Sequence, residues 1–165
     1  MSTELDPRWA LLRRPFPPDQ LEKKPQVNCR ACTDAGKAAR AARDKHCDRH
    51  QVRECPHCHA YITTGHIDLD YVGHANCTNR LLEADPMWTW EPFSLDPRGL
   101  PALDTDGNLW IRLTVLGSTK PGVGDGPNMK ERIGDAIRNA AMRFGVALDL
   151  WSKEELESES NGQVS

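Results

Sequence analysis

Polar and apolar side chains alternate most regularly over residues 109–116. A period of two predicts a β-strand with one face in a core and the other face free to contact solvent or a ligand. The apolar face consists of Leu109, Ile111, Leu113 and Val115, and the opposite face consists of Trp110, Arg112 and Thr114. The outward face of this strand is therefore partly aromatic and partly basic.

A helical pattern follows over residues 133–144, where apolar side chains recur at i, i+3, i+4 and i+7, and Gly145 supplies a stop signal. The apolar stripe consists of Ile133, Ala136, Ile137, Ala140, Ala141 and Phe144. The opposite side carries Arg132, Asn139 and Arg143, with Arg138 at its border. An aromatic and basic sheet face beside a basic helix face is typical of folds that bind a nucleic-acid strand. Taken alone, the charge pattern favours a solvated helix over an ordinary sheet.

The preceding residues predict a further helix and a further strand. Residues 67–83 suit a helix capped by Asp68 or Asp70, and residues 88–94 suit a strand that forms an antiparallel hairpin with the one described above. A third short strand is expected near residues 116–123. The predicted fold class is α+β: a small antiparallel β-β-β sheet packed with a long helix, preceded by a helix and a zinc-binding module.

Composition divides the chain into four expected segments. The first segment is rich in proline, which suggests an extended arm, and the second holds five of the six cysteines but few bulky apolar residues. A globular segment and a polar, acidic, disordered tail follow. The expected boundaries are 1–25 for the arm, 26–60 for the zinc-binding module, 61–151 for the core and 152–165 for the tail.

Three pairs of potential metal ligands lie in the cysteine-rich segment. They are Cys29 and Cys32, Cys47 and His50, and Cys55 and Cys58. In each pair a gap of two residues lets one tight turn present both side chains to a tetrahedral ion. A reducing cytoplasm disfavours disulfides. We therefore expect one or two structural zinc ions per chain.

The pairing of these ligands is open from sequence. One combination, a zinc ribbon, uses Cys29, Cys32, Cys55 and Cys58, and the other, a zinc finger, uses Cys29, Cys32, Cys47 and His50. With the finger, a second ion could bind Cys55 and Cys58 together with His66 and one of His57, His59 or His74.

The net charge of -3 conceals a division along the chain. Residues 22–60 carry nine basic and five acidic side chains, residues 61–151 eight and twelve, and residues 152–165 one and four. The amino-terminal module is therefore basic, and the acidic tail could contact a protein partner. Because the sequence has no apolar run long enough for a membrane span or a signal peptide, we expect a cytoplasmic protein without a membrane partner.

Motifs for bond-making chemistry are missing from the sequence. The segment PGVGDGPNMK lacks the Lys-Ser or Lys-Thr pair of a phosphate-binding loop, so it suits a turn or a strand end. The Cys55-Pro56-His57-Cys58 segment lacks the upstream His-x-Glu of a zinc deaminase. We therefore expect a binding protein rather than an enzyme.

The order helix, strand, strand, glycine-bearing strand and helix over residues 67–151 resembles the core of the Rad-fifty-two-type single-strand annealing proteins, including relatives encoded by actinobacterial bacteriophages. The most specific stretch is GVGDG followed by KERIGDAIRNAAMRFGVALDL. The matching positions are Gly134, Asp135, Ala136, Ile137, Arg138, Ala140, Phe144 and Gly145. The segment YVGHANCTNRLLEADPMWTWEP resembles the family's first helix and first strand.

This resemblance implies ATP-independent binding of single-stranded DNA and annealing of complementary strands in recombination and repair, by a homo-oligomeric ring or filament in the cytoplasm of a bacterial host. Arg138 falls where the family has a DNA-contacting lysine, and Asn139 falls where it has an arginine. The expected DNA-binding residues are Lys130, Arg132, Arg138, Asn139, Arg143, Trp110 and Arg112. The zinc module is not part of the family core. A zinc-finger regulator of duplex DNA and a DNA-processing enzyme with structural zinc therefore stay open as alternatives.

Overall fold

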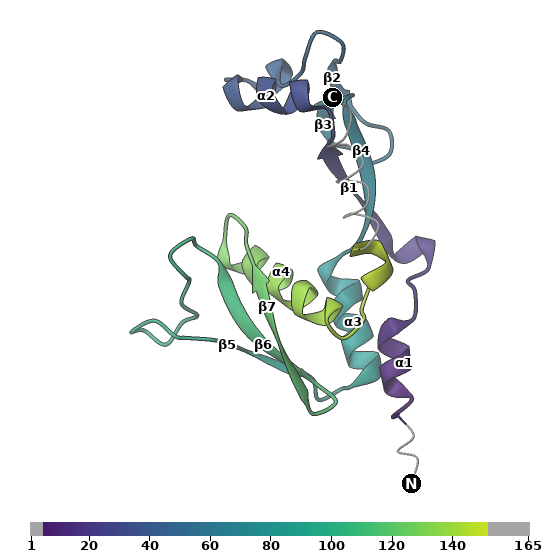
Figure 1. The fold of residues 1–165 in the computed structure, drawn as a ribbon, viewed down its shortest axis with the longest axis vertical. Coiled ribbons are helices and arrows are strands. Elements are labelled where there is room, and N and C mark those ends of the chain that lie inside the picture. Colours follow the sequence, from purple (N-terminus) through teal and green to yellow (C-terminus); the bar gives the residue numbers. More distant parts are fainter. Residues whose placement is uncertain (1–4, 152–165) are drawn as a thin grey trace. The chain divides into compact units, whose positions relative to one another are not determined.

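The computed structural model describes residues 5–151, which form two compact units (Figure 1). The first unit comprises residues 5–20 and 72–148, and the second comprises residues 21–71 with residues 149–151. The acidic tail predicted at 152–165 lies outside the described residues. No helix within residues 5–151 is both long enough and apolar enough to cross a membrane.

The first unit is built on a three-stranded antiparallel sheet with the order β5-β6-β7. Its strands are β5 (Thr89–Pro92), β6 (Leu109–Val115) and β7 (Ser118–Gly124), and helix α4 (Met129–Met142) packs on one face of the sheet. The four aliphatic side chains of β6 that the alternation predicts to be buried have no exposed surface. This arrangement confirms the predicted α+β fold, with the core between β6 and α4.

Helix α4 lies directly against the backbone of β7. A Cβ atom at Gly122 or Gly124 would clash with backbone atoms of α4, including the carbonyl oxygens of Ala136 and Arg132. The glycines of the PGVGDG segment therefore allow close helix–sheet packing at a strand end. At the start of α4, the Asn128 side chain accepts a hydrogen bond from the Glu131 backbone at 3.0 Å, which caps the helix.

The predicted extended arm is wrong for its central part, because residues 8–13 form helix α1 (Arg8–Arg13), which packs against α3 (His74–Ala84). A one-turn helix, η1 (Pro18–Gln20), follows. Leu12 has no exposed surface and Arg80 of α3 is 3% exposed. The Arg80 guanidinium donates hydrogen bonds to the backbone carbonyls of Leu11 and Arg14 and lies 4.0 Å from the centroid of the Phe16 ring. The buried Arg80 side chain therefore holds the proline-rich segment against α3. The local sequence pattern did not predict this contact.

The second unit contains short elements: β1 (Leu21–Val27), α2 (Arg30–Ala38), η2 (Ala42–Asp44), β2 (Val52–Glu54), β3 (Tyr61–Thr63) and β4 (His66–Val72). Strand β1 pairs with β4, and β2 pairs antiparallel with β3. The helix predicted over residues 67–83 is thus wrong in its first part, because residues 66–72 are held as a strand by β1. Helix α3 begins at His74 after Gly73, so Asp68 and Asp70 are strand residues and not caps.

Candidate functional site

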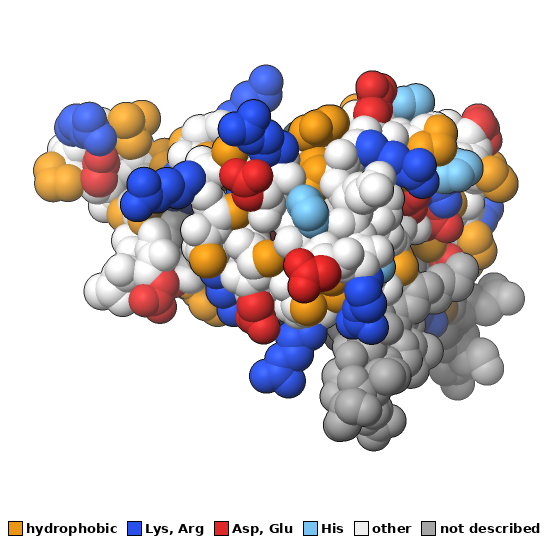
Figure 2. All heavy atoms as spheres, turned by 90° about the horizontal axis from the view of Figure 1, so that it is seen from above, with side chains coloured by type: hydrophobic (Ala, Val, Ile, Leu, Met, Phe, Trp, Pro, Cys, Tyr) orange, Lys and Arg blue, Asp and Glu red, His pale blue; other side chains and the backbone are white. Residues whose placement is uncertain are grey.

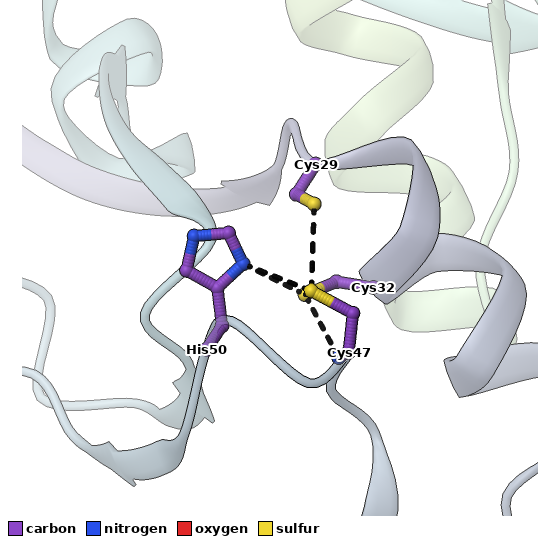
Figure 3. Close-up of side chains that lie close together, drawn as sticks. All are labelled: Cys29, Cys32, Cys47 and His50. Atoms are coloured by element: carbon purple, nitrogen blue, oxygen red, sulfur yellow. Dashed lines mark hydrogen bonds between the residues drawn. The ribbon is translucent and has the colours of Figure 1, made fainter.

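Four side chains of the second unit, which we call the first Cys/His group, converge from two segments (Figure 3). Cys29 precedes α2 and Cys32 lies in its first turn, whereas Cys47 and His50 lie in the loop between η2 and β2. The Cys47 sulfur lies 4.0 Å from the Cys29 sulfur and 3.6 Å from the Cys32 sulfur. The His50 Nδ1 atom lies 3.3 Å from the sulfurs of both Cys32 and Cys47.

These separations are those of ligands around one tetrahedral ion. Zinc–sulfur bonds of about 2.3 Å and zinc–nitrogen bonds of about 2.0–2.1 Å place two sulfurs about 3.8 Å apart and a sulfur and a nitrogen about 3.6 Å apart. The first Cys/His group therefore could hold a metal ion in the finger combination. Cys29 and Cys32 are not grouped with Cys55 and Cys58, so the structure does not form the ribbon combination.

Surrounding groups stabilise the thiolates that such an ion requires. The buried Cys32 sulfur lies 3.2 Å from the Thr63 hydroxyl and 3.4 Å from the Cys47 backbone nitrogen, which can both donate hydrogen bonds to it. A hydrogen bond from the Arg49 backbone N–H lowers the pKa of Cys47 to about 6, whereas burial raises the pKa of Cys32. Hydrogen bonds to a metal-bound sulfur orient the ligand and support its charged form.

Gly65 is a structural requirement of this group that sequence reasoning missed. Its carbonyl accepts hydrogen bonds from the backbone N–H groups of Asn28 and Cys29 at 3.1 and 3.2 Å. A Cβ atom at Gly65 would lie 2.8 Å from His50 Nδ1, 2.9 Å from the Cys29 Cβ and 3.1 Å from the Cys32 sulfur. The residue between β3 and β4 therefore has to lack a side chain for the group to close.

A second group of the same unit consists of Cys55, Cys58, His66 and Asp68, whose ligand atoms all lie within 4.8 Å of one another. Cys55 and Cys58 occupy the turn between β2 and β3, and His66 and Asp68 lie on one face of β4. The sequence indicated His66 as a partner of the two cysteines, but its other candidates, His57, His59 and His74, are not members of either group. Asp68 was missed because it was assigned to a helix cap. If HIDLD is taken as a strand, His66 and Asp68 are two residues apart and lie on the same face, which would have predicted Asp68 as a member of this group.

The outward face of the sheet in the first unit carries an aromatic and basic cluster. The Trp110 and Phe93 ring centroids are 6.0 Å apart, and the Arg112 guanidinium lies 4.1 Å from the Phe93 ring centroid. Phe93 is 44% exposed and Trp110 is 40% exposed, although the Trp110 indole N–H donates a hydrogen bond to Asp104 at 2.9 Å. The structure therefore brings Trp110 and Arg112 together and adds Phe93, which the sequence analysis did not include.

The candidate residues of α4 and Arg143, which follows the last residue of the helix, have different environments. Lys130 and Arg143 are exposed, whereas Arg132 and Arg138 are half-buried. Arg132 donates to the Gly107 carbonyl at 2.9 Å and Arg138 pairs with Asp135 at 2.9 Å. The Asn139 side-chain oxygen accepts hydrogen bonds from the backbone N–H of edge strand β7 and from Arg143. Several of these polar groups therefore have partners within the chain.

The sheet separates the two sets of candidate DNA-binding residues. Helix α4 covers the face that contains the buried aliphatic residues of β6, whereas Trp110 and Arg112 lie on the opposite face. A single strand of DNA that contacts the aromatic cluster is thus not on the same face as one that contacts α4. No protein-family model matches the chain, and a search of curated proteins finds no significant match.

Proposed function

We propose that the chain is a zinc-containing protein that binds single-stranded DNA and anneals complementary strands without ATP. The observation that carries this proposal is the cluster of exposed Phe93 and Trp110 with half-buried Arg112, on a sheet whose other face is covered by α4. Flat rings stack on bases of any sequence, and a guanidinium binds phosphate or stacks with them. Such contacts leave the pairing edges of the bases available to a second strand.

On the face of the molecule seen in Figure 2, local contacts with nucleic acid are a better explanation than a broad basic surface. Basic and acidic side chains are interspersed on the face seen in Figure 2. Strand annealing requires no bond-making residue, only a surface that holds the backbones of the strands and leaves their bases free to pair. The glycine-bearing strand and the helix that carry the family resemblance pack against each other in the first unit, which supports the same proposal.

The direct test measures binding of a labelled single strand to Trp110→Ala and Arg112→Ala by fluorescence anisotropy at several salt concentrations. Loss of one stacked base should weaken binding by about 1–3 kcal/mol, and loss of one phosphate contact should lower the salt slope by about 0.7. Trp110→Phe should retain most of the affinity. Tyr61→Ala serves as the matched control, because it removes a 61% exposed ring from the other unit.

The same measurement is made for Arg138 of α4 and for Arg143, which directly follows this helix. Arg138→Ala and Arg143→Ala should lower the salt slope for all sequences alike if these residues bind phosphate. Unchanged affinity and slope in the sheet variants and in the α4 variants would contradict the proposed surfaces. Failure of the wild-type protein to accelerate annealing of complementary oligonucleotides would contradict the annealing function itself.

The proposal also includes a zinc ion that is bound by the first Cys/His group and stabilises the second unit. Native mass spectrometry should detect at least one zinc ion per chain, and a chelator should unfold residues 21–71 before the first unit, as measured by hydrogen exchange. A metal-free protein of unchanged stability would contradict it.

A zinc-finger regulator of duplex DNA is the second candidate function. It is favoured by a set of exposed basic side chains in the second unit: Arg30, Lys37, Arg40, Arg43, Lys45, Arg49 and Arg53. Competition between single-stranded and duplex DNA separates the candidates, because the annealing protein prefers single strands and the regulator prefers the duplex.

A further inference from the structure

The second group of ligand-type side chains meets the distances of a separate metal site. The Cys58 sulfur lies 3.7 Å from His66 Nε2, His66 Nε2 lies 3.3 Å from Asp68 Oδ1, and the Cys55 sulfur lies 3.5 Å from Asp68 Oδ2. Around a tetrahedral zinc ion with ordinary bond lengths, a nitrogen and an oxygen lie about 3.3–3.5 Å apart and a sulfur and a nitrogen about 3.6 Å apart. The four side chains thus surround a volume of the right size for one ion.

The orientation of His66 directs one ring nitrogen into this volume. Its Nδ1 atom lies 2.5 Å from the Thr63 carbonyl oxygen, which can only accept a hydrogen bond, so Nδ1 carries a proton. In the neutral ring, Nε2 then presents a lone pair to Cys58 and Asp68. A backbone carbonyl that fixes the tautomer in this way is the usual outer contact of a metal-binding histidine.

Asp68 provides an independent sign of a missing cation. Its Oδ1 atom is buried and has no hydrogen-bond partner among the described residues. A buried carboxylate oxygen without a donor is costly, and here it faces the unprotonated Nε2 of His66 at 3.3 Å. Two facing acceptors are satisfied either by a metal ion between them or by a second proton on the His66 ring. A count of bound metal ions separates these two cases.

We propose that Cys55, Cys58, His66 and Asp68 hold a second zinc ion, with the Asp68 carboxylate as the fourth ligand. The two sites differ in chemistry, because the first Cys/His group offers three thiolates and the second offers two thiolates and a harder oxygen. The second ion is therefore released first when a chelator competes for both.

The test counts zinc in the full-length protein by native mass spectrometry, at a chelator concentration that leaves the wild type fully loaded. The wild type should hold two ions and Asp68→Ala should hold one. Asp70→Ala is the matched control, because Asp70 lies on the same strand but pairs with Lys23 at 2.5 Å outside both groups, and this variant should hold two. A count of one in the wild type, or of two in Asp68→Ala, would overturn the proposal.

A second variant covers the case in which Asp68→Ala does not fold. Asp68→Cys retains four ligands and converts the second group to three thiolates and one imidazole. With cobalt in place of zinc, the intensity of the thiolate-to-cobalt charge-transfer band should rise from that of five thiolates per chain to that of six, about 1.2-fold. The same band intensity in wild type and Asp68→Cys would show that residue 68 does not bind the ion. Neither readout depends on nucleic acid.

Discussion

The Gly65→Ala substitution tests whether the first Cys/His group needs the β3–β4 connection to lie directly against its ligands. The added Cβ atom would lie 2.8 Å from His50 Nδ1 and 2.9 Å from the Cys29 Cβ atom, which is several tenths of an ångström closer than ordinary contact. Neither neighbour can move away freely. The Cys29 Cβ atom is bonded to the backbone, and the His50 ring has to keep its position if it is to bind the ion. The ligands therefore have to move apart.

The size of the effect follows from this overpacking. Inserting a methyl group into a closely packed site costs about 1–3 kcal/mol. If the whole cost falls on the metal-bound state, zinc affinity at the first group should fall by about 5- to 140-fold, at 1.4 kcal/mol for each factor of ten.

The assay is a competition titration with a chromophoric chelator, in which Gly36→Ala is the matched control. Gly36 lies in α2 of the same unit, and the nearest atom to an added Cβ there is the Lys45 Cβ at 3.9 Å. Alanine in a helix interior is favoured over glycine by about 0.5–1 kcal/mol, so Gly36→Ala should bind zinc at least as tightly as the wild type. Equal zinc affinity for Gly65→Ala and Gly36→Ala would refute the argument.

Four further outcomes are expected. Arg80→Met should lower the free energy of unfolding by about 2–4 kcal/mol, as measured by urea titration, because two backbone carbonyls lose their charged donor. An unchanged urea midpoint would show that other contacts hold the α1 segment. Gly122→Ala should lower the melting temperature of the first unit, since the added methyl group meets the backbone of α4, and an unchanged melting temperature would contradict that packing. Hydrogen bonds from the Asn108 backbone N–H and the Trp110 indole N–H lower the pKa of Asp104. The stability that they give to the β5–β6 connection is therefore complete above the ordinary pKa of 3.8 and is lost as the pH falls through the lowered pKa. Tryptophan fluorescence should change in acid for the wild type but not for Asp104→Asn. Light scattering should detect an oligomer, because the sheet has two edge strands that a neighbouring subunit could cover, and a monomer at all concentrations with and without DNA would contradict this.

The sheet and α4 could be predicted from sequence because their signals are local. Alternation in β6 and the i, i+3, i+4 spacing in α4 each follow from one short segment that packs against a single partner. The expected strand at residues 116–123 corresponds to β7 (Ser118–Gly124), and the helix stop at Gly145 has the positive φ of +98° that favours glycine.

The errors arose where a distant segment decides the structure. Residues 66–72 carry enough apolar side chains for a helix, but β1, which begins 45 residues before them in the chain, pairs with them and makes them a strand. Helix α1 likewise depends on Arg80, whose guanidinium reaches carbonyls 66 and 69 residues away in sequence. Neither partner can be recognised from the local pattern.

The grouping of the metal ligands shows the same limit. Spacing identified each Cys-x-x-Cys or Cys-x-x-His pair, since one turn presents both side chains, but it could not say which pairs meet. The β2–β3 hairpin decides this by carrying Cys55 and Cys58 on its turn, toward the side chains at the start of β4. Because residues 66–72 form a strand and not a helix, Asp68 lies on the same face of β4 as His66.

The second unit has too small an apolar core to account for its fold. Among the described side chains of residues 21–71, the buried apolar ones are Leu69 and two cysteines, Cys32 and Cys55, which belong to the two ligand groups. By contrast, the first unit buries most of the aliphatic side chains of β6 and α4. Structural zinc contributes about 10–16 kcal/mol at neutral pH in small domains, which exceeds what one buried leucine supplies, about 1.5–3 kcal/mol. We therefore expect the stability of residues 21–71 to depend on metal binding by the two ligand groups more than on their one buried leucine.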